Sequence, residues 1–283
     1  MSLDDPGREA IAEKGWLLAH KWLLLRRGAQ LFFLGIFLVG PLTAFWLVEG
    51  NLASSRTLDL LPLTDPLLVL QSLAARHLPE TTALLGAVIV LAGYLVVGGR
   101  TYCSWVCPVN VVTDAAHWLH IKLGLAKGWQ PKPGTRYGML ALVLLGSAVT
   151  GTIFWEVVNP VTIVHRALVF GLAGAWLIIA AIFLFDLLVS RRGWCSHLCP
   201  VGAFYGQINR ASLLKISAAK RETCDDCMDC FAVCPEPQVI TPALKSKGSP
   251  VVSHWACTNC ARCIDVCSKD VYRFTLRGME TRP

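Results

Sequence analysis

Two closely spaced runs of four cysteines constrain this chain more than any other feature of its sequence. Both runs have the spacing C-x2-C-x2-C-x3-C, which is the ligand pattern of proteins that bind two [4Fe–4S] clusters. Pro235 directly follows the first run, whereas Ser268 stands at the corresponding position after the second. The two runs are Cys224, Cys227, Cys230 and Cys234, and Cys257, Cys260, Cys263 and Cys267.

In proteins with this pattern, the fourth cysteine of each run ligates the cluster that the other run holds. Zinc is the alternative, but zinc sites are built from paired C-x2-C knuckles rather than from four closely spaced cysteines, repeated. We therefore expect a ferredoxin-type domain with two [4Fe–4S] clusters at the carboxyl end. The predicted ligands are Cys224, Cys227, Cys230 and Cys267 for cluster 1, and Cys257, Cys260, Cys263 and Cys234 for cluster 2.

The remaining four cysteines form two C-x3-C-P motifs. Cysteines at positions i and i+4 share one helical face or one tight turn, and a proline after the second suits the first turn of a new helix. Four thiolates could hold a further metal centre. The alternatives are a redox dithiol or disulfide within each pair, or a docking surface without metal. The motifs are Cys103 and Cys107 before Pro108, and Cys195 and Cys199 before Pro200.

The composition outside the tail is that of a membrane protein. Hydrophobic residues make up 54% of the chain and charged residues only 16%, whereas a soluble protein carries about 25% charged residues. Four apolar stretches approach the roughly 20 residues that cross a bilayer, and Pro41 bends the first. The expected spans are about 31–48, 81–97, 137–158 and 168–189.

Lysine and arginine residues predict the orientation of these spans. Five precede the first span, five lie between the second and third, and thirteen follow the fourth, whereas the other two loops hold three. Since basic residues concentrate on the cytoplasmic side, both termini and all twelve cysteines should face the cytoplasm. The net charge of +7 is then a topology signal and indicates no nucleic-acid partner. The acidic, polar first ten residues are not those of a cleavable signal peptide.

The membrane part contains an internal repeat. Asp65-Pro66 leads through an apolar stretch and Arg100 to the first C-x3-C-P motif, and Asn159-Pro160 leads through another to the second. Parallel repeats are related by a pseudo-two-fold axis along the membrane normal, which could bring the two motifs together. Arg100 and its counterparts, Arg191 and Arg192, either anchor the topology or stabilise thiolates.

The fold class we expect is therefore a membrane α-helical protein. Four transmembrane helices form two parallel two-helix repeats, and a small two-cluster ferredoxin-like domain follows. The expected parts are a cytoplasmic N-terminal segment (1–28), a four-span domain (29–216) and the ferredoxin-type domain (217–283). The stretches after Pro108 and Pro200 should form amphipathic helices at the membrane surface.

This combination of spans, twin C-x3-C-P motifs and a two-cluster tail resembles the NapH-type ferredoxin-like quinol dehydrogenase subunit of periplasmic nitrate reductase systems. The NosR-type and MauN-type membrane iron–sulfur proteins share the same modules, and residues 51–71 are similar to NapH in particular. The resemblance implies quinol oxidation in the bacterial inner membrane and electron delivery to a NapG-like periplasmic iron–sulfur protein. A NapC-like cytochrome is a further partner that it implies.

A quinol site needs hydrogen-bonding partners and a proton acceptor. The candidates in the outer loops are Asp65, His77, Glu156 and His165, and solvated loop residues are the alternative interpretation. On the inner side, His197 lies between Cys195 and Cys199, where the first repeat has a tryptophan. Asp186 is an ionisable residue within the fourth span.

Two other functions remain open. A CcoG-type metal-reducing assembly factor also combines spans with C-x3-C-P motifs and a ferredoxin tail. A redox-sensing membrane regulator would use its clusters to report rather than to conduct, but the chain offers no output domain.

Overall fold

The computed structural model describes residues 6–43, 45–125, 128–129, 131–132, 134–171, 174–246 and 248–278. The outermost residues of the expected N-terminal and ferredoxin-type parts (1–5 and 279–283), and Lys127 of the positive-charge pattern, lie outside these ranges. The chain forms two compact units, each assembled from distant segments. Unit 1 contains residues 1–29, 94–105 and 205–283, and unit 2 contains residues 30–93 and 106–204.

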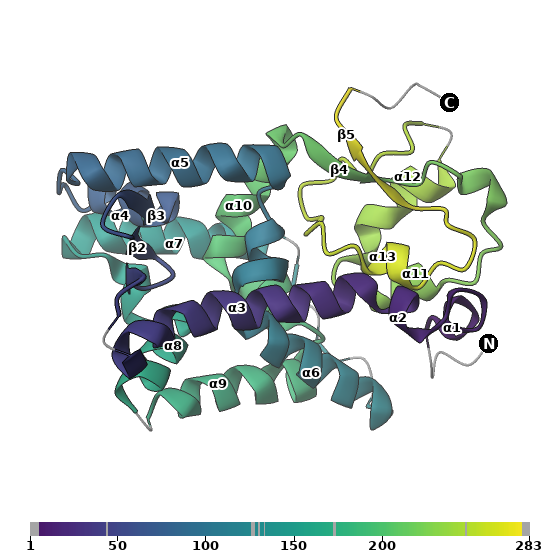
Figure 1. Cartoon of the computed structure of the whole chain (residues 1–283), viewed down its shortest axis with the longest axis horizontal. Coiled ribbons are helices and arrows are strands. Elements are labelled where there is room, and N and C mark those ends of the chain that lie inside the picture. Colours follow the sequence, from purple (N-terminus) through teal and green to yellow (C-terminus); the bar gives the residue numbers. More distant parts are fainter. Residues whose placement is uncertain are drawn as a thin grey trace. The chain divides into compact units, whose positions relative to one another are not determined.

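The expected repeat is confirmed as two copies of one order of elements. Each copy begins with a short helix whose N-cap side chain, Asp65 or Asn159, accepts a hydrogen bond from the backbone two residues on and whose first residue is proline. A longer apolar helix, a π-helical turn and a further helix follow (Figure 1). The copies are α4 (Pro66–Ala74), α5 (Thr81–Val97), η1 (Tyr102–Val106) and α6 (Val109–Lys122), then α8 (Pro160–Phe170), α9 (Ala175–Leu184) with η3 (Phe185–Val189), η4 (Trp194–Leu198) and α10 (Pro200–Ala211).

Among the described residues, one helix is long and apolar enough to cross a membrane: α3 (Lys21–Thr43), which contains Pro41. The second expected span coincides with α5, but that helix has 17 residues. The third shortens to α7 (Thr135–Thr150), because Gly151 ends the helix in a left-handed conformation. The fourth shortens to residues 175–189, because Gly171 ends α8 in the same way. The four-span arrangement thus stays a prediction.

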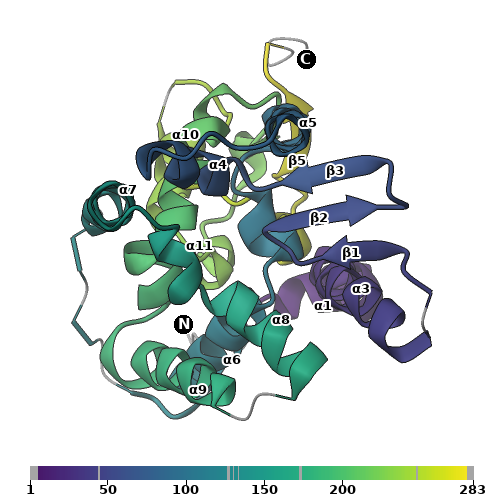
Figure 2. The same ribbon diagram turned by 90° about the vertical axis from the view of Figure 1, so that its left-hand side faces the viewer.

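Unit 2 also contains a three-stranded antiparallel sheet that the sequence did not lead us to expect (Figure 2). Its central strand β2 pairs with β1 and β3, with Glu49 opposite Arg56 and Ser55 opposite Leu63. Strands of three or four residues are too short for alternation of apolar and polar residues to reveal them. The strands are β1 (Val48–Gly50), β2 (Ser54–Thr57) and β3 (Leu61–Thr64).

Unit 1 contains the ferredoxin tail, which folds around a two-stranded sheet. Strands β4 (Leu214–Ser217) and β5 (Arg273–Leu276) pair antiparallel and bring the two ends of the tail together. Between them lie short helices and the loops that hold most cysteines of the two runs. These are η5 (Arg221–Thr223), α11 (Asp229–Val233), η6 (Pro237–Val239), α12 (Ile240–Lys245) and α13 (Arg262–Asp265).

The N-terminal segment belongs to the same unit as the tail. It consists of α1 (Arg8–Lys14), α2 (Trp16–Ala19) and the start of α3. Buried Asp265 accepts hydrogen bonds from the backbone N–H groups of Trp22 and Leu23, both at 3.0 Å. A carboxylate at a helix N-terminus satisfies unpaired N–H groups and complements the helix dipole. The compact units therefore do not follow the expected boundaries 1–28, 29–216 and 217–283, because these contacts join the first part to the last.

Candidate functional site

The first cysteine-lined cavity lies between the two runs. Cys224, Cys227 and Cys230 of the first run line it together with Cys267, the last cysteine of the second run. Tyr272 and Val271 close its buried side, and the carboxylates of Asp225 and Asp226 lie at its rim. Cys224 and Cys227 stay partly exposed, so this cavity faces solvent.

The second cavity mirrors the first, and more of its cysteines are buried. Its cysteine lining consists of Cys257, Cys260 and Cys263 of the second run and Cys234 of the first. Cys257 and Cys260 are both buried. The other lining residues are mostly apolar: Ile216, Pro235, Glu236, Val239, Ile240, Val252, Ala256 and Thr258.

Cysteines that line the same cavity raise the pKa of one another's thiols. Burial raises the pKa of the Cys263 thiol, and the neighbouring Cys260, Cys234 and Cys257 raise it further. Burial likewise raises the pKa of Cys230, where Cys267 adds to the effect. Such thiols lose their protons when they coordinate a metal. Each cavity thus offers four converging cysteines, with the fourth supplied by the other run.

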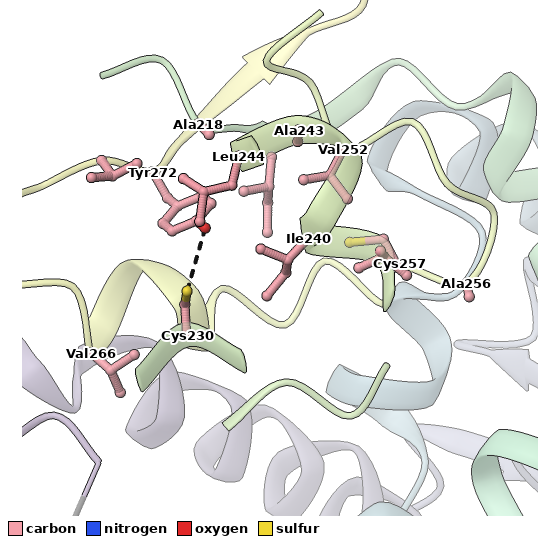
Figure 3. Close-up of a cluster of buried hydrophobic side chains, with 13 residues drawn as sticks. Ala218, Cys230, Ile240, Ala243, Leu244, Val252, Ala256, Cys257, Val266 and Tyr272 are labelled. Atoms are coloured by element: carbon pink, nitrogen blue, oxygen red, sulfur yellow. Dashed lines mark hydrogen bonds between the residues drawn. The ribbon is translucent and has the colours of Figure 1, made fainter. Parts of the chain in front are cut away.

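The cavities fit a cluster better than a single ion. Among the described residues, no group of three or more His, Cys, Asp or Glu side chains is gathered closely enough to hold one metal ion. The four cysteines instead surround a space, as four ligands of a cubane cluster do. The donor set is all sulfur, which suits iron–sulfur clusters. A buried apolar core that includes Cys230 and Cys257 lies between the two sites (Figure 3).

Two donors point at sulfur atoms of the first cavity. The hydroxyl of Tyr272 donates a hydrogen bond to Cys230 Sγ at 3.5 Å, as Figure 3 shows. The backbone N–H of Val271 donates to Cys267 Sγ at 3.4 Å. Tyr272 is 4% exposed, so water does not compete for its hydroxyl. Hydrogen bonds to cluster sulfur atoms are among the factors that set reduction potentials.

Replacing Tyr272 by phenylalanine should lower the reduction potential of cluster 1 and leave that of cluster 2 unchanged. The hydroxyl stabilises negative charge on Cys230, and that charge increases when the cluster is reduced. A redox titration followed by electron paramagnetic resonance (EPR) measures both potentials in one sample. Equal shifts of both signals, or none, would show that the hydroxyl does not act on this sulfur.

A buried ion pair adjoins the second cavity. Arg100 Nη1 donates to Glu236 Oε1 at 3.0 Å and to the carbonyl oxygen of Ala256 at 2.7 Å. The side chains of Arg100 and Glu236 are 2% and 4% exposed. Glu236 lies two residues after Cys234, and Ala256 directly precedes Cys257. Arg100 is therefore no surface anchor, which was one of the two interpretations of its sequence position; its contacts lie within unit 1.

The C-x3-C-P motifs lie at breaks between an apolar helix and the next helix, as expected. Within unit 2, Cys107 packs against Trp194 in an apolar cluster, and Thr113 Oγ1 lies 3.6 Å from Cys195 Sγ. Burial raises the pKa of Cys195, and Cys107 and Cys199 raise it further. The two repeats thus bring these three cysteines together. Cys103 belongs to unit 1.

Most of the outer quinol-site candidates have structural contacts. Asp65 accepts from Leu67 N at 2.9 Å and caps α4. Glu156 accepts from Asn159 and Thr162, both at 2.8 Å, at the start of α8. Asp65 is thus a helix-capping group, and Glu156 binds two side chains at the start of α8, one of them the N-cap Asn159.

The two outer histidines differ from each other. His77 Nε2 lies 2.9 Å from the carbonyl oxygen of Gly151 in an exposed position. His165 is 7% exposed, packs edge-on against the ring of Phe37, and its Nε2 has no hydrogen-bond partner among the described residues. His165 is therefore the outer candidate with an atom left for a ligand.

The inner candidates lie beside the second motif. His197 is part of the π-helical turn η4, between Cys195 and Cys199, and is partly buried. Asp186 is fully buried and accepts a hydrogen bond from Trp194 N at 2.9 Å, which positions the start of that turn. Asp186 thus positions this turn through one oxygen, and its Oδ2 is buried without a hydrogen-bond partner among the described residues.

Neither the hydrogen bond of Tyr272 to Cys230 nor the pairing of Arg100 with Glu236 was predicted from the sequence. One sequence feature could have indicated the role of Tyr272. It lies five residues after Cys267, and a buried tyrosine usually needs a hydrogen-bond partner. No sequence pattern indicates the pairing of Arg100 with Glu236, because 136 residues separate the two.

Comparison with family models places iron–sulfur modules on both regions. A "4Fe-4S binding domain" model matches residues 80–126 and 172–218, which contain the two C-x3-C-P motifs. A "4Fe-4S dicluster domain" model matches residues 216–268, which contain both cysteine runs. The chain therefore carries 4Fe-4S binding domains in its repeats and in its tail. No solved structure shows a significant match.

Several characterised sequences are similar over nearly the whole chain. The methylamine utilization ferredoxin-type protein MauN of Methylorubrum extorquens is 53% identical over 275 residues, which cover 97% of this chain and 96% of the relative. The ferredoxin-type protein NapH of Escherichia coli is 49% identical over 274 residues, or 96% of each chain. NapH of Haemophilus influenzae is 48% identical over 273 residues, covering 96% of this chain and 95% of the relative.

Proposed function

This chain belongs to the NapH and MauN family of ferredoxin-type electron-transfer proteins, and on that premise we propose that it oxidises quinol at a membrane and passes the electrons through iron–sulfur clusters to a partner iron–sulfur protein. The observation that carries the proposal is the pair of cavities in the tail. Each is lined by four cysteines, three from one run and one from the other. Two [4Fe–4S] clusters held there would accept one electron each, which matches the two electrons of a quinol.

Four membrane spans form the second part of the proposal. Helices α5, α7 and residues 175–189 are about 22 to 26 Å long at 1.5 Å per residue, somewhat shorter than the roughly 30 Å of hydrocarbon. Helices α3, α5, α7 and α9 all expose large apolar side chains, which water would disfavour. Examples are Phe32 on α3, Leu85 on α5, Val149 on α7 and Leu177 on α9. With both termini on the cytoplasmic side, the protein would lie in a bacterial inner membrane.

A third centre at the C-x3-C-P motifs is the next element. Cys107, Cys195 and Cys199 interact within unit 2, and the repeat assigns Cys103 as the fourth ligand. The match of an iron–sulfur model to both repeats supports this ligand set. Such a centre would divide the electron path from a quinol site to the tail into two shorter steps. The hydrocarbon layer is too thick for a single electron-transfer step.

His165 is the residue we propose as the proton acceptor from quinol. Burial, with a smaller effect of neighbouring Arg166, lowers the pKa of His165. The imidazole is therefore neutral near pH 7, which is the form that accepts a proton. Its Nε2 is buried without a hydrogen-bond partner in the described part of the chain.

The partner that we propose rests on the similarity to NapH. A NapG-like periplasmic iron–sulfur protein is the electron acceptor we propose, with a NapC-like cytochrome as a further component of a nitrate reductase system. The similarity to MauN favours a second setting, because the name of that relative assigns it to methylamine utilization. In either pathway, nitrate reduction or methylamine utilization, the chain would use the same membrane helices and clusters, and only its partner would differ.

Anaerobic reduction of the purified full-length protein by duroquinol tests this function. We expect the visible absorbance of the oxidised clusters to bleach and their EPR signals to appear. Reduction by dithionite in a parallel sample shows that the clusters are intact. Clusters that dithionite reduces and duroquinol does not would exclude quinol oxidation and favour a regulator or a metal-reducing assembly factor.

A further inference from the structure

The segment around the first cysteine of the first C-x3-C-P motif lies directly against the tail. Residues 94–105 and the tail belong to one compact unit. Arg100 donates to Glu236 and to the carbonyl oxygen of Ala256. Ser104 Oγ donates to the carbonyl oxygen of Thr258 at 2.7 Å. These bonds flank Cys103 on both sides.

Further hydrogen bonds involve Asn259 of the same tail loop. Trp105 Nε1 donates to the carbonyl oxygen of Asn259 at 3.1 Å, and Asn259 Nδ2 donates to the carbonyl oxygen of Val97 at 3.2 Å. Ser104, Arg100 and Asn259 are each 2% exposed, so these bonds are shielded from water and hold a fixed geometry.

The tail residues in these contacts line the second cavity, except Asn259, which lies in the chain between its cysteines Cys257 and Cys260. Residues 256–259 surround Cys257, and Glu236 lies two residues after Cys234. Both cysteines line the second cavity, and Glu236, Ala256 and Thr258 line it as well. Ser104 follows Cys103 and Thr258 follows Cys257, so covalent bonds and one hydrogen bond link the two cysteines.

The charges around the two cavities also differ. Burial raises the pKa of Cys257 to about 11, and the positive charges of Lys215 and Arg100 act in the opposite direction. The charged groups near the first cavity are the carboxylates of Asp225, Asp226 and Asp229, together with Lys245, which pairs with Asp226. Because Arg100 is paired with Glu236, buried Lys215 is the cation that favours a reduced, more negative cluster at the second cavity.

We infer that electrons enter the tail through cluster 2 and reach cluster 1 only from there, with Ser104 as the positioning residue of the entry route. The inference rests on the proposed function, since it takes quinol as the electron source. Quinol releases two protons and two electrons, and each tail cluster gains one electron without a change in its bonds to the protein. Cluster 1, with its partly exposed Cys224 and Cys227, is then the point at which electrons leave the tail.

Two matched cysteine variants test this order. Cys227→Ala removes a ligand of cluster 1, and Cys260→Ala removes the corresponding ligand of cluster 2. Stopped-flow mixing of each full-length variant with duroquinol measures the entry of electrons, and dithionite measures whether the remaining cluster is intact. We expect the remaining cluster of Cys227→Ala to be reduced at the wild-type rate. The remaining cluster of Cys260→Ala should respond to dithionite but hardly to duroquinol.

Ser104→Ala provides a readout that does not depend on losing a cluster. The variant should slow reduction by duroquinol about tenfold, as loss of an outer-shell partner can, with unchanged reduction by dithionite. Thr101→Val is the matched control, because its hydroxyl donates to the carbonyl oxygen of Val97, four residues earlier in the chain, and not to the tail. Wild-type rates with duroquinol in Cys260→Ala or in Ser104→Ala would overturn the inference. A wild-type protein that duroquinol cannot reduce would instead refute the proposed function, and the inference with it.

Discussion

Replacing Cys234 by alanine is expected to remove cluster 2, although this cysteine belongs to the first run. Its side chain lines the second cavity together with Cys257, Cys260 and Cys263. The Cys234 thiol is also one of the neighbours that raise the pKa of the Cys263 thiol. Anaerobic protein should lose about four iron atoms and one EPR signal, corresponding to one [4Fe–4S] cluster.

The control for this variant is Cys224→Ala, in the same run but at the other cavity. It should remove the other EPR signal, whereas Cys260→Ala should remove the same signal as Cys234→Ala. The reciprocal variant Cys267→Ala should behave as Cys224→Ala does. If Cys234→Ala and Cys224→Ala abolish the same signal, each run holds its own cluster and the ligand assignment is wrong.

Replacing Arg100 by methionine is expected to destabilise the tail by about 3–5 kcal/mol, the usual cost of removing one member of a buried ion pair. Methionine preserves much of the apolar volume but leaves Glu236 as a buried carboxylate without its cation. The carbonyl oxygen of Ala256 also loses a donor. Urea unfolding of the detergent-solubilised protein, followed by the loss of cluster absorbance, measures the change.

The double variant Arg100→Met with Glu236→Leu distinguishes the ion pair from simple packing. Replacing both charges by apolar groups is often neutral for a buried pair, so the second substitution should restore much of the lost stability. Arg56 forms an exposed ion pair with Asp59, and Arg56→Met should cost less than about 1 kcal/mol. Equal costs for Arg100→Met and Arg56→Met would contradict the role of the buried pair.

The features that the sequence predicted well are those that depend on local spacing. The cysteine runs predicted two sets of four cysteines with the fourth member exchanged, and each set lines one cavity. That these sets ligate clusters stays a prediction. The repeat was visible because Asp65-Pro66 and Asn159-Pro160 are capping signals at matching distances from their motifs. Both signals concern residues close together in the chain.

The features that it did not predict depend on contacts between distant segments. Asp265 caps a helix that begins 244 residues earlier, and no pattern near either end reveals that contact. The same holds for Ser104 and Thr258. Asp65 and Glu156 were predicted as candidates for a quinol site because an isolated carboxylate in a loop gives no sign that its oxygens cap a helix or accept from neighbouring side chains. Span lengths were overestimated where glycines end α7 and α8 inside apolar stretches.

Iron and acid-labile sulfide per chain, measured on anaerobically purified full-length protein, test the central claim most directly. The account predicts about twelve of each, for two clusters in the tail and one at the C-x3-C-P motifs. The variant Cys103→Ser with Cys195→Ser should hold about eight. A wild-type protein that contains no iron, or a variant that contains as much as the wild type, would contradict the account.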